Sequence, residues 1–315
     1  MKKELNTNIN EFQCTICGKK NHRFIFTGYD RMHENSGFFD IYECNNCGLF
    51  TTHPRLSRNQ MTLYYPENYI CYLPAIEDES NWFSFINRWL GLRKRVNLIH
   101  KISGNIGRIL DIGCATGILL SGMQKKGWDC FGVEPDKNAA IYAEKRFGFS
   151  IINGYLEDTN FPDNYFDVVT IMDVLEHVQD PKTFIKEIRR ILKTDGFLIA
   201  TLPNSSAWER YIFGPYWIGW DVPRHYRTFN NENIKIFLSR LGFSNINVFS
   251  FTGRQGAFMI SLNFWLKEWN GPIFIKKFLR RFFSSFLIRI LTFPIFLLEE
   301  RFNRSTIMSF YAQNR

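Results

Sequence analysis

A glycine turn between two apolar runs holds the first residues whose types and spacing could do chemistry. The run 108–112 is typical of a strand, the turn after it contains Gly113, Ala115 and Gly117, and a second apolar run ends at Glu134. Small residues let the backbone N–H groups of a helix start approach a ligand, and an acid that ends the next strand can accept hydrogen bonds from two ribose hydroxyls. This order predicts a site for a nucleoside cofactor.

The turn departs from the pattern of dinucleotide sites. A G-x-G-x-x-G order places a pyrophosphate on the helix start, whereas here Gly113-x-Ala115-x-Gly117 is followed by Ile118. The missing glycine disfavours a nucleotide-dependent oxidoreductase, which stays as an alternative. The run 110–117 resembles instead the first motif of the class I S-adenosylmethionine (SAM)-dependent methyltransferases.

Further motifs extend this resemblance over roughly residues 95–250. They lie, in order, at 153–157, 165–169, 173–178 and 192–196. The resemblance implies that Gly113 and Gly117 pass close to the methionine moiety of SAM, that Glu134 binds its ribose, and that Glu157 faces its adenine. The remaining residues of the predicted cofactor site are Asp111, Cys114, Leu156 and Met172.

Acids and histidines follow the fourth strand of the predicted sheet. Asp173, Glu176 and His177 have i, i+3 and i+4 spacing, which places their side chains on one face if the segment is helical. A second histidine, His225, lies in the run 223–229. The set resembles the E-x-x-E-H motif with a distal histidine that holds Mg²⁺ in small-RNA 2′-O-methyltransferases, and the related motif of ubiquinone-pathway O-methyltransferases. The first acid here is an aspartate, one methylene shorter.

These four residues are the predicted catalytic group. Asp173, Glu176, His177 and His225 can bind Mg²⁺, which lowers the pKa of an acceptor hydroxyl. Alternatively, His177 or His225 acts as a general base without a metal. An acidic helix start with a structural histidine is the third interpretation.

Two C-x-x-C-G motifs near the N-terminus predict a metal site. Cys14, Cys17, Cys44 and Cys47 offer four soft thiolates, which suit tetrahedral zinc in a structural site. The glycine after each pair permits a tight turn around the metal, and the long interval between the pairs predicts a hairpin with an extended loop. Four core cysteines without a metal are the alternative, and a zinc-ribbon adaptor for nucleic acid is a further one. Nucleic acid is disfavoured because no basic and aromatic residues interleave here as in a stacking platform.

Composition limits the cellular setting. The odd number of cysteines, seven, favours metal binding in a reducing compartment over a disulfide framework. No apolar run follows Met1-Lys-Lys-Glu-Leu-Asn, so we expect no secretory signal and a cytoplasmic location. The net charge is +9, with basic residues concentrated towards the C-terminus.

The segment 273–298 interleaves those basic residues with phenylalanine and isoleucine. Its apolar residues come in pairs every four positions, from Phe274-Ile275 to Ile290-Leu291. On one continuous helix such a stripe drifts by about 40° per repeat and winds around the axis. No apolar stretch reaches the ~18 residues that a membrane span needs. We expect a helical insertion that wraps a protein surface or makes peripheral contact with a membrane.

Aromatic residues are dense after the fifth predicted strand, and we expect them to form a substrate lid with stacking surfaces. Arg224 and Arg227 could pair there with a phosphate or carboxylate of the acceptor. A second aromatic segment, 64–72, either packs or lines the substrate cleft. The residues of the expected lid are Trp208, Tyr211, Phe213, Tyr216, Trp217, Trp220 and Tyr226.

The alternation of apolar and helical runs predicts an α/β fold with a Rossmann-like, doubly wound, seven-stranded methyltransferase sheet. The predicted strands are 108–114, 129–134, 149–153, 166–172, 196–202, 246–251 and 307–312. The predicted regions are a zinc-ribbon-like domain (1–56), a Tyr-rich linker (57–92), a SAM-binding domain (93–251) with an aromatic substrate loop (203–229), and a C-terminal helical insertion with the last strand (252–315).

The predicted reaction is methyl transfer from SAM. The CxxCG pairs, the Tyr-rich linker and the Pro-Arg-His225 loop together resemble methyltransferases that act on sugars or cell-surface glycans, which implies O-methylation of a sugar or glycan precursor. C- or N-methylation of a nucleotide-sugar or small metabolite is the alternative. The expected partner is a small-molecule or glycan acceptor.

Overall fold

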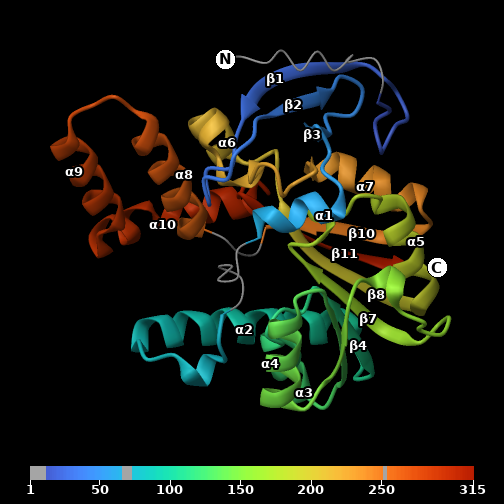
Figure 1. The fold of residues 1–315 in the computed structure, drawn as a ribbon. Coiled ribbons are helices and arrows are strands. Elements are labelled where there is room, and N and C mark those ends of the chain that lie inside the picture. Colours follow the sequence, from blue (N-terminus) through green and yellow to red (C-terminus); the bar gives the residue numbers. More distant parts are fainter. Residues whose placement is uncertain (1–11, 66–72, 251–253) are drawn as a thin grey trace. The chain divides into compact units, whose positions relative to one another are not determined.

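The computed structural model describes residues 12–65, 73–250 and 254–315, which fall into two compact units (Figure 1). We call the first the ribbon unit, made of Met1–Tyr65, Pro203–Phe237 and Phe249–Met308. The second is the sheet unit, made of Pro66–Leu202, Leu238–Val248 and Ser309–Arg315. Each unit is described by itself below.

A seven-stranded sheet with the order β10-β11-β8-β7-β4-β5-β6 organises the sheet unit. The strands from β4 to β8 pair in parallel, and β4 lies between β5 and β7, where the strand order reverses. Parallel sheets of this type bind ligands at the carboxyl ends of the strands near such a reversal. The bounds are β4 (Arg108–Ile112), β5 (Asp129–Glu134), β6 (Ser150–Asn153), β7 (Phe166–Met172), β8 (Leu192–Pro203), β10 (Phe243–Phe249) and β11 (Ile307–Asn314).

The helices of the sheet unit begin and end at residues with clear local signals. Asp136 caps α4 by accepting from the Ala139 N–H, and Gly148 ends that helix with a φ of 75°. Asp180 caps α5, which starts with Pro181 at its first turn, as expected from the sequence. The helices are α2 (Trp82–Ser103), α3 (Ile118–Gln124), α4 (Lys137–Phe147) and α5 (Pro181–Ile191), with short 3₁₀ turns η2 (Ile76–Asp78), η3 (Leu156–Asp158) and η4 (Leu175–His177).

The main core of this unit lies between the sheet and three of its helices. Val96 and Ile99 of α2 and Leu120 of α3 pack with strand residues such as Ile109 and Val168. β-branched side chains fit this pleated, doubly covered surface. The core therefore holds fixed the strand ends that carry the predicted cofactor site.

The predicted strands are all present, and two of them, β5 and β7, have the expected bounds. The largest difference is in β8, which starts at Leu192, four residues before the expected start of this strand at Gly196. Asp195 takes a left-handed φ of 64° within this strand. β10 begins three residues earlier than expected, at Phe243, and its expected last residue, Phe251, lies outside the described residues.

A four-stranded antiparallel sheet organises the ribbon unit, in the order β1-β2-β3-β9. Its fourth strand comes from far along the chain, and Phe50 and Thr51 of β3 pair with Thr228 and Arg227. The strands are β1 (His22–Gly28), β2 (Phe39–Cys44), β3 (Phe50–His53) and β9 (Arg227–Thr228). The helices are α1 (Arg58–Met61), η1 (Thr62–Tyr64), α6 (Trp208–Phe213), η5 (Gly214–Tyr216), η6 (Ile218–Trp220), α8 (Arg254–Glu268), α9 (Ile273–Ser284) and α10 (Phe286–Arg301), and α7 (Asn231–Arg240) crosses the boundary between the units.

The aromatic segment expected to be a substrate lid supplies much of the core of the ribbon unit. Trp217, Trp220 and Tyr226 are buried with Phe39 and Phe50 of the small sheet. Phe213 belongs to the same cluster, whereas Tyr211 is exposed. The expectation of a lid is wrong for the buried rings, because aromatic side chains of this size stabilise a small sheet best when they are packed.

The two units also group the chain differently from the predicted linear regions. Residues 203–229, expected within the SAM-binding domain, and the helices of the expected insertion belong to the ribbon unit. That the four predicted regions are separate domains stays a prediction. Most of the Tyr-rich segment, residues 66–72, lies outside the described residues, while Tyr64 is buried and donates to the Ser36 carbonyl over 2.7 Å.

The C-terminal segment forms two helices, whereas one continuous helix with an apolar stripe winding around it was considered from the sequence. α9 ends at Ser284, and the Ser285 hydroxyl starts α10 by accepting from the Ile288 N–H. The apolar pairs are therefore divided between two helices, because a serine cap ends the regular repeat. Among the described residues, none of the helices has the length and apolar character to cross a membrane.

Candidate functional site

The turn after β4 has the left-handed backbone that its small residues predict. Gly113, Ala115 and Gly117 have φ values of 72°, 47° and 76°. A Cβ atom at position 113 would lie 2.7 Å from a methyl carbon of Val174, so only glycine fits there without movement. Ala115 is the departure from the family motif, and its single methyl group is accommodated despite the left-handed φ. The turn thus leads directly into α3 at Ile118.

Glu134 at the end of β5 is tied to this turn. Its side chain is buried, with 3% of its surface exposed. One carboxylate oxygen accepts from the Ala115 N–H over 2.8 Å, and the other accepts from the Asp136 N–H over 2.8 Å. Burial raises the pKa of Glu134, while the two N–H donors act in the opposite direction. Each oxygen retains a further lone pair, so the oriented carboxylate can accept from ribose hydroxyls.

Asp111 is the next-to-last residue of β4, and its side chain is also buried. It accepts a hydrogen bond of 2.6 Å from the Thr170 hydroxyl of β7. Burial raises its pKa to about 7, which the Thr170 hydrogen bond partly offsets. Asp111 therefore links β4 to β7 beside the predicted cofactor site.

The other residues of the predicted cofactor site differ in exposure. The Cys114 side chain packs in the main core of the sheet unit, so its backbone is the part that faces the turn. Leu156 is buried and Glu157 is exposed in η3, and the Met172 sulfur accepts from the Thr201 hydroxyl over 3.6 Å. Their contacts with a cofactor stay predictions.

The segment after β7 is not the helix that the spacing of its acids requires. Asp173 has a left-handed φ of 56°, and its backbone N–H donates to the Thr201 carbonyl over 2.9 Å. Only the short 3₁₀ turn η4, Leu175–His177, follows. The expected i, i+3, i+4 face is therefore wrong, because Asp173 lies outside the helical turn. Its carboxylate accepts from the Thr201 hydroxyl over 3.1 Å.

Two members of the predicted catalytic group remain neighbours at this edge of the sheet. The side-chain ligand atoms of Glu176 and His177 lie within 4.8 Å of each other, and Glu176 is buried. Asp173, Glu176 and His177 belong to the sheet unit, whereas His225 belongs to the ribbon unit. The four-residue Mg²⁺ site consequently stays a prediction.

His225 is held by contacts within the ribbon unit. Its Nδ1 lies 2.9 Å from the Gly219 carbonyl, which can only accept, so we assign a proton to Nδ1. Nε2 lies 3.9 Å from a carboxylate oxygen of Asp221. The Thr52 hydroxyl donates to the His225 carbonyl over 2.6 Å. When the ring is neutral, Nε2 is therefore its basic nitrogen.

The two arginines expected to meet the acceptor are used inside the ribbon unit. Arg224 is fully buried, as is Asp30, and its guanidinium donates to both oxygens of Asp30 over 2.8 and 3.1 Å. It also donates to both oxygens of Asp221 over 2.6 and 2.9 Å. Burial opposes ionisation of Asp30, but the Arg224 guanidinium holds the pKa of that carboxyl below its usual value.

The expected role of Arg224 in acceptor binding is wrong, because its donors are used by these two carboxylates and by the Tyr64 carbonyl. Arg227 is buried too and donates to the Thr15 hydroxyl over 2.8 Å. Asp30 and Arg224 are far apart in the sequence, and no local motif links them. Sequence reasoning therefore missed this ion network.

The cysteine pairs form the predicted cluster. The Cys14 and Cys47 sulfurs lie 3.4 Å apart, those of Cys17 and Cys44 lie 3.5 Å apart, and all four lie within 4.8 Å of one another. All four are free thiols. The hydrogen bond with Cys47 lowers the pKa of Cys14 to about 4.

The donor set fits zinc. Tetrahedral Zn–S bonds of about 2.3 Å place the sulfur atoms about 3.8 Å apart, close to the separations found. Gly18 and Gly48 have φ values of 72° and 68°, and their N–H groups donate to the Cys14 and Cys44 carbonyls. Each C-x-x-C-G motif thus makes the tight turn that directs two thiols to one point.

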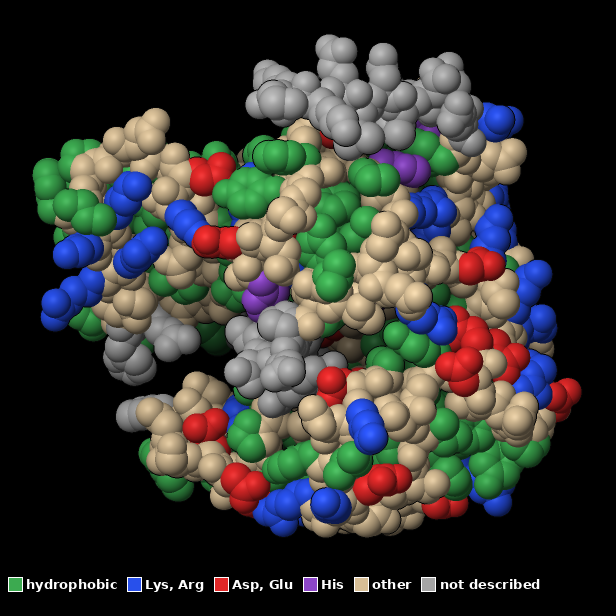
Figure 2. All heavy atoms as spheres, viewed as in Figure 1, with side chains coloured by type: hydrophobic (Ala, Val, Ile, Leu, Met, Phe, Trp, Pro, Cys, Tyr) green, Lys and Arg blue, Asp and Glu red, His purple; other side chains and the backbone are tan. Residues whose placement is uncertain are grey.

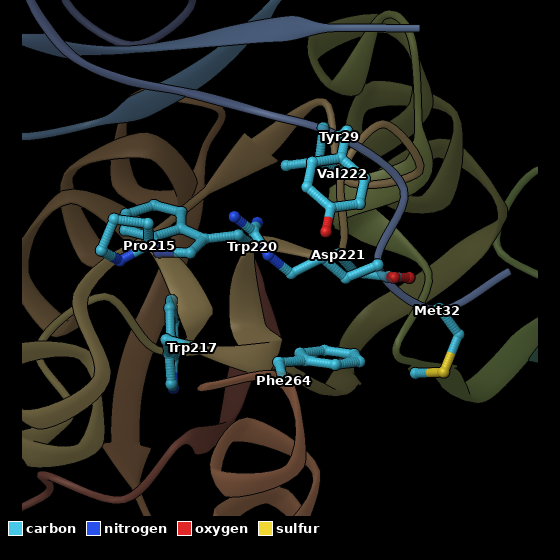
Figure 3. Close-up of a pocket in the computed structure, with 9 residues that line it drawn as sticks. Tyr29, Met32, Pro215, Trp217, Trp220, Asp221, Val222 and Phe264 are labelled. Carbon is cyan, nitrogen blue, oxygen red and sulfur yellow. The ribbon is translucent and has the colours of Figure 1, made fainter. Parts of the chain in front are cut away.

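A small pocket also lies within the ribbon unit (Figure 3). The rings of Trp217, Trp220 and Phe264 surround it, and the Asp221 carboxylate is its acidic group. That carboxylate is already paired with Arg224. Arg31 and Tyr29, which also line the pocket, both donate to Glu268. The pocket therefore combines apolar surface with polar side chains that each have a protein partner.

Curated relatives of the chain are O-methyltransferases. The chain is 28% identical over 162 residues to a ubiquinone biosynthesis O-methyltransferase of Pectobacterium atrosepticum, covering 44% of this chain and 66% of the relative. It is 33% identical over 129 residues to the enzyme of the same name in Maricaulis maris, covering 37% and 49%. The matches thus span between half and two thirds of the relatives' own lengths. Their names point to ubiquinone rather than to glycans.

A solved structure with a similar fold is a SAM-dependent methyltransferase from Archaeoglobus fulgidus. It has 18% identity and a TM-score of 0.47, covering 70% of this chain and 92% of the other. A likeness of this size carries no argument about ligand or reaction.

A family comparison covers the sheet unit's predicted cofactor site. The model of the methyltransferase domain family matches residues 78–248, more than half of the 315 residues. The match favours methyl transfer over the oxidoreductase and nucleic-acid alternatives. Together with the strand order and the glycine turn, it shows that the chain belongs to the methyltransferase domain family.

Proposed function

We propose that the sheet unit binds SAM and that the protein methylates a hydroxyl oxygen of a small-molecule acceptor. The observation that supports this most is the buried Glu134 carboxylate, which the Ala115 N–H orients at the carboxyl ends of adjacent parallel strands. A carboxylate at this place in a parallel sheet suits the ribose of a nucleoside cofactor. SAM, when bound, supplies an activated methyl group.

The residues proposed to hold SAM surround the glycine turn. The backbone at Gly113 and Gly117 is proposed to pass close to its methionine moiety, and Glu134 is proposed to accept from its ribose hydroxyls. The turn at Leu156 and Glu157 lies at the end of β6, the strand next to β5, and is proposed to face the adenine. Asp111, Cys114 and Met172 complete the proposed site.

The proposed acceptor chemistry depends on proton removal. A hydroxyl acceptor must lose its proton as its oxygen bonds to carbon, and a neutral imidazole can take that proton. His177 or His225 is the proposed base. The alternative proposal uses Asp173, Glu176, His177 and His225 as ligands of Mg²⁺, because carboxylate oxygens are typical ligands of this ion.

Fewer observations bear on the acceptor than on the cofactor. O-methylation is favoured because the relatives from Pectobacterium atrosepticum and Maricaulis maris are named as O-methyltransferases. A sugar or glycan acceptor, and C- or N-methylation of a nucleotide-sugar or small metabolite, stay as alternatives. One argument for a sugar acceptor no longer holds. Trp217 and Trp220 were expected to stack on the acceptor, but both are core residues.

We further propose that Cys14, Cys17, Cys44 and Cys47 bind one structural zinc ion. The cluster supplies four sulfurs, which leaves no ligand position for a substrate in a tetrahedral site. The ion would stabilise the ribbon unit and take no part in methyl transfer.

Calorimetric titration of the full chain with SAM tests the cofactor proposal. We expect saturable binding with one site per chain. No detectable binding of SAM or of S-adenosylhomocysteine by the folded protein would refute it, whatever the acceptor.

A second experiment distinguishes the two acceptor chemistries. If Mg²⁺ is required, EDTA abolishes methyl transfer and added Mg²⁺ restores it. If an imidazole acts alone, EDTA has no effect and the rate rises with pH as that imidazole loses its proton. His225→Ala and His177→Ala then identify which ring is used, with SAM affinity measured as the check on folding.

A further inference from the structure

The helices α9 and α10 expose an unusual amount of large apolar surface. On α9, Phe274 and Phe278 expose 69% and 62% of their surface, and Leu287 and Leu291 on α10 expose 72% and 70%. Contiguous exposed apolar surface marks an interaction site in a folded protein. Within the part of the chain that the structure describes, other exposed apolar residues are more scattered.

The exposed rings of α9 lie on one face of the helix. Phe274, Phe278 and Phe282 are spaced four residues apart, and the last two are stacked with their ring centroids 5.7 Å apart. Leu279 and Phe283 point the other way and pack against the core of the ribbon unit. The helix is therefore anchored by one side and presents an aromatic stripe on the other.

Cations flank this stripe, and the acids of α9 and α10 are limited to Glu299 and Glu300 in the last turn of α10. Lys277, Arg280 and Arg281 are exposed on α9, with Lys276 half-buried beside them. The sequence from Pro272 to Leu298 contains no aspartate or glutamate. Figure 2 shows Lys and Arg side chains gathered next to apolar ones where Figure 1 places α9.

We propose that the exposed face of α9 and α10 binds the surface of an anionic phospholipid bilayer. In-plane amphipathic helices bury aromatic and aliphatic residues at the boundary of headgroups and acyl chains, while Lys and Arg contact the anionic headgroups. A segment with several cations and no acid matches such a surface in charge. A protein partner would need an acidic, apolar face of the same extent, whereas a bilayer offers both properties at once.

The expected affinity is modest and depends on charge. Each cation near an anionic membrane surface strengthens binding by roughly fivefold at physiological salt or below. Loss of the two exposed arginines Arg280 and Arg281 is therefore expected to weaken binding by on the order of 20-fold. High salt should weaken it as well, because it screens these contacts.

Co-sedimentation of the full chain with vesicles tests the proposal. We expect binding to vesicles of phosphatidylcholine with a quarter of phosphatidylglycerol, and at least tenfold weaker binding to phosphatidylcholine alone. The variant Phe274→Ser, Phe278→Ser, Phe282→Ser should lose binding to the anionic vesicles. Because these rings are exposed, the variant should keep the far-ultraviolet circular dichroism spectrum of the parent.

A matched control removes three apolar side chains that are also exposed in the ribbon unit, by Leu63→Ser, Tyr211→Ser and Ile212→Ser. This variant should bind the anionic vesicles as the parent does. Equal binding to neutral and anionic vesicles, or equal binding by both triple variants, would overturn the proposal. So would a dimer in light scattering that the phenylalanine variant abolishes while vesicles fail to bind, since the face would then join two copies of the chain.

Discussion

Glu134 of the sheet unit and Arg224 of the ribbon unit are buried in opposite ways. In the sheet unit, the Glu134 carboxylate is fixed by two backbone N–H groups and keeps lone pairs for a ligand. In the ribbon unit, Arg224 and Asp30 are fully buried and satisfy each other. Burial of a charge is therefore no sign of function by itself. A functional site is indicated only where the partners of the buried group leave part of its bonding capacity unused.

The largest effect is expected where the ribbon unit depends on metal ligands. Cys44→Ser removes one of four sulfurs, and we expect loss of about one zinc ion per chain together with loss of the ribbon unit's tertiary structure, because structural zinc supplies much of the folding free energy of small domains. Metal analysis and near-ultraviolet circular dichroism measure both. Cys130→Ala in the core of the sheet unit is the control, and its zinc content should equal that of the parent.

The second-largest effect is expected from breaking the buried ion network of Arg224, Asp30 and Asp221. Arg224→Met leaves Asp30 and Asp221 without their cation, and removal of one member of a buried pair destabilises by about 3–5 kcal/mol. Urea unfolding measures this change. Lys125→Ala, which removes an exposed ion pair with Glu77, should change the free energy of unfolding by less than about 1 kcal/mol. Similar values for the two variants would mean that the buried pair is not a structural element.

A substitution of Glu134 tests whether the buried acid of the sheet unit binds a ligand. Glu134→Gln removes the charge that is proposed to accept from the ribose. Hydrogen bonds to a charged group contribute about 1.5–3 kcal/mol, so SAM should bind roughly 10- to 100-fold more weakly. Isothermal titration calorimetry gives the dissociation constants. Asp129→Asn, at the exposed start of the same strand, should leave SAM affinity unchanged, and an unchanged affinity in Glu134→Gln would remove Glu134 from the site.

The smallest effect concerns a second buried acid of the ribbon unit. Glu209 on α6 has 1% of its surface exposed, and burial together with the charge of Glu299 raises its pKa to about 9. A raised pKa means that the folded state holds the proton more tightly than the unfolded state. The stability that this provides is complete below the unfolded pKa of about 4.5 and is lost as the pH rises towards 9.

Glu209→Gln should therefore flatten the dependence of stability on pH. Between pH 5 and 8, the parent should lose at least about 1.4 kcal/mol more than the variant, the equivalent of one pKa unit. Chemical denaturation at several pH values measures the slope. Parallel slopes for the two proteins would show that Glu209 is ionised in the folded state. Asp111, whose pKa is raised to about 7, remains in both proteins and contributes equally.

Much of the sheet unit could be predicted because its signals are local. The turn at Gly113, the cap at Asp180 followed by Pro181, and the β-branched run of β7 each depend on residues a few positions apart. Local reasoning failed at Asp173, where the spacing of acids indicated a helix. The left-handed φ of that residue and its bonds to Thr201 on the neighbouring strand decide otherwise.

The ribbon unit was harder to predict because its contacts join distant segments. The cysteine cluster was predicted, since each C-x-x-C-G motif shapes its own turn. The pairing of β3 with β9 and the bond from Arg227 to Thr15 have no counterpart in any sequence window. Periodicity cannot distinguish a ring in the core from a ring in a lid, which is why Trp217 and Trp220 were misassigned.

The sequence by itself determined the family, the glycine turn, the acid that ends the next strand, and the cysteine cluster, because local backbone preferences and the chemistry of neighbouring residues specify them. Only the tertiary structure decided that Arg224 is buried in an ion network, that Arg227 belongs to strand β9, and that the phenylalanines of α9 face outward. The physical reason is that the free energy of a buried charge or an apolar ring depends on its partners in space. Those partners lie far away in the chain.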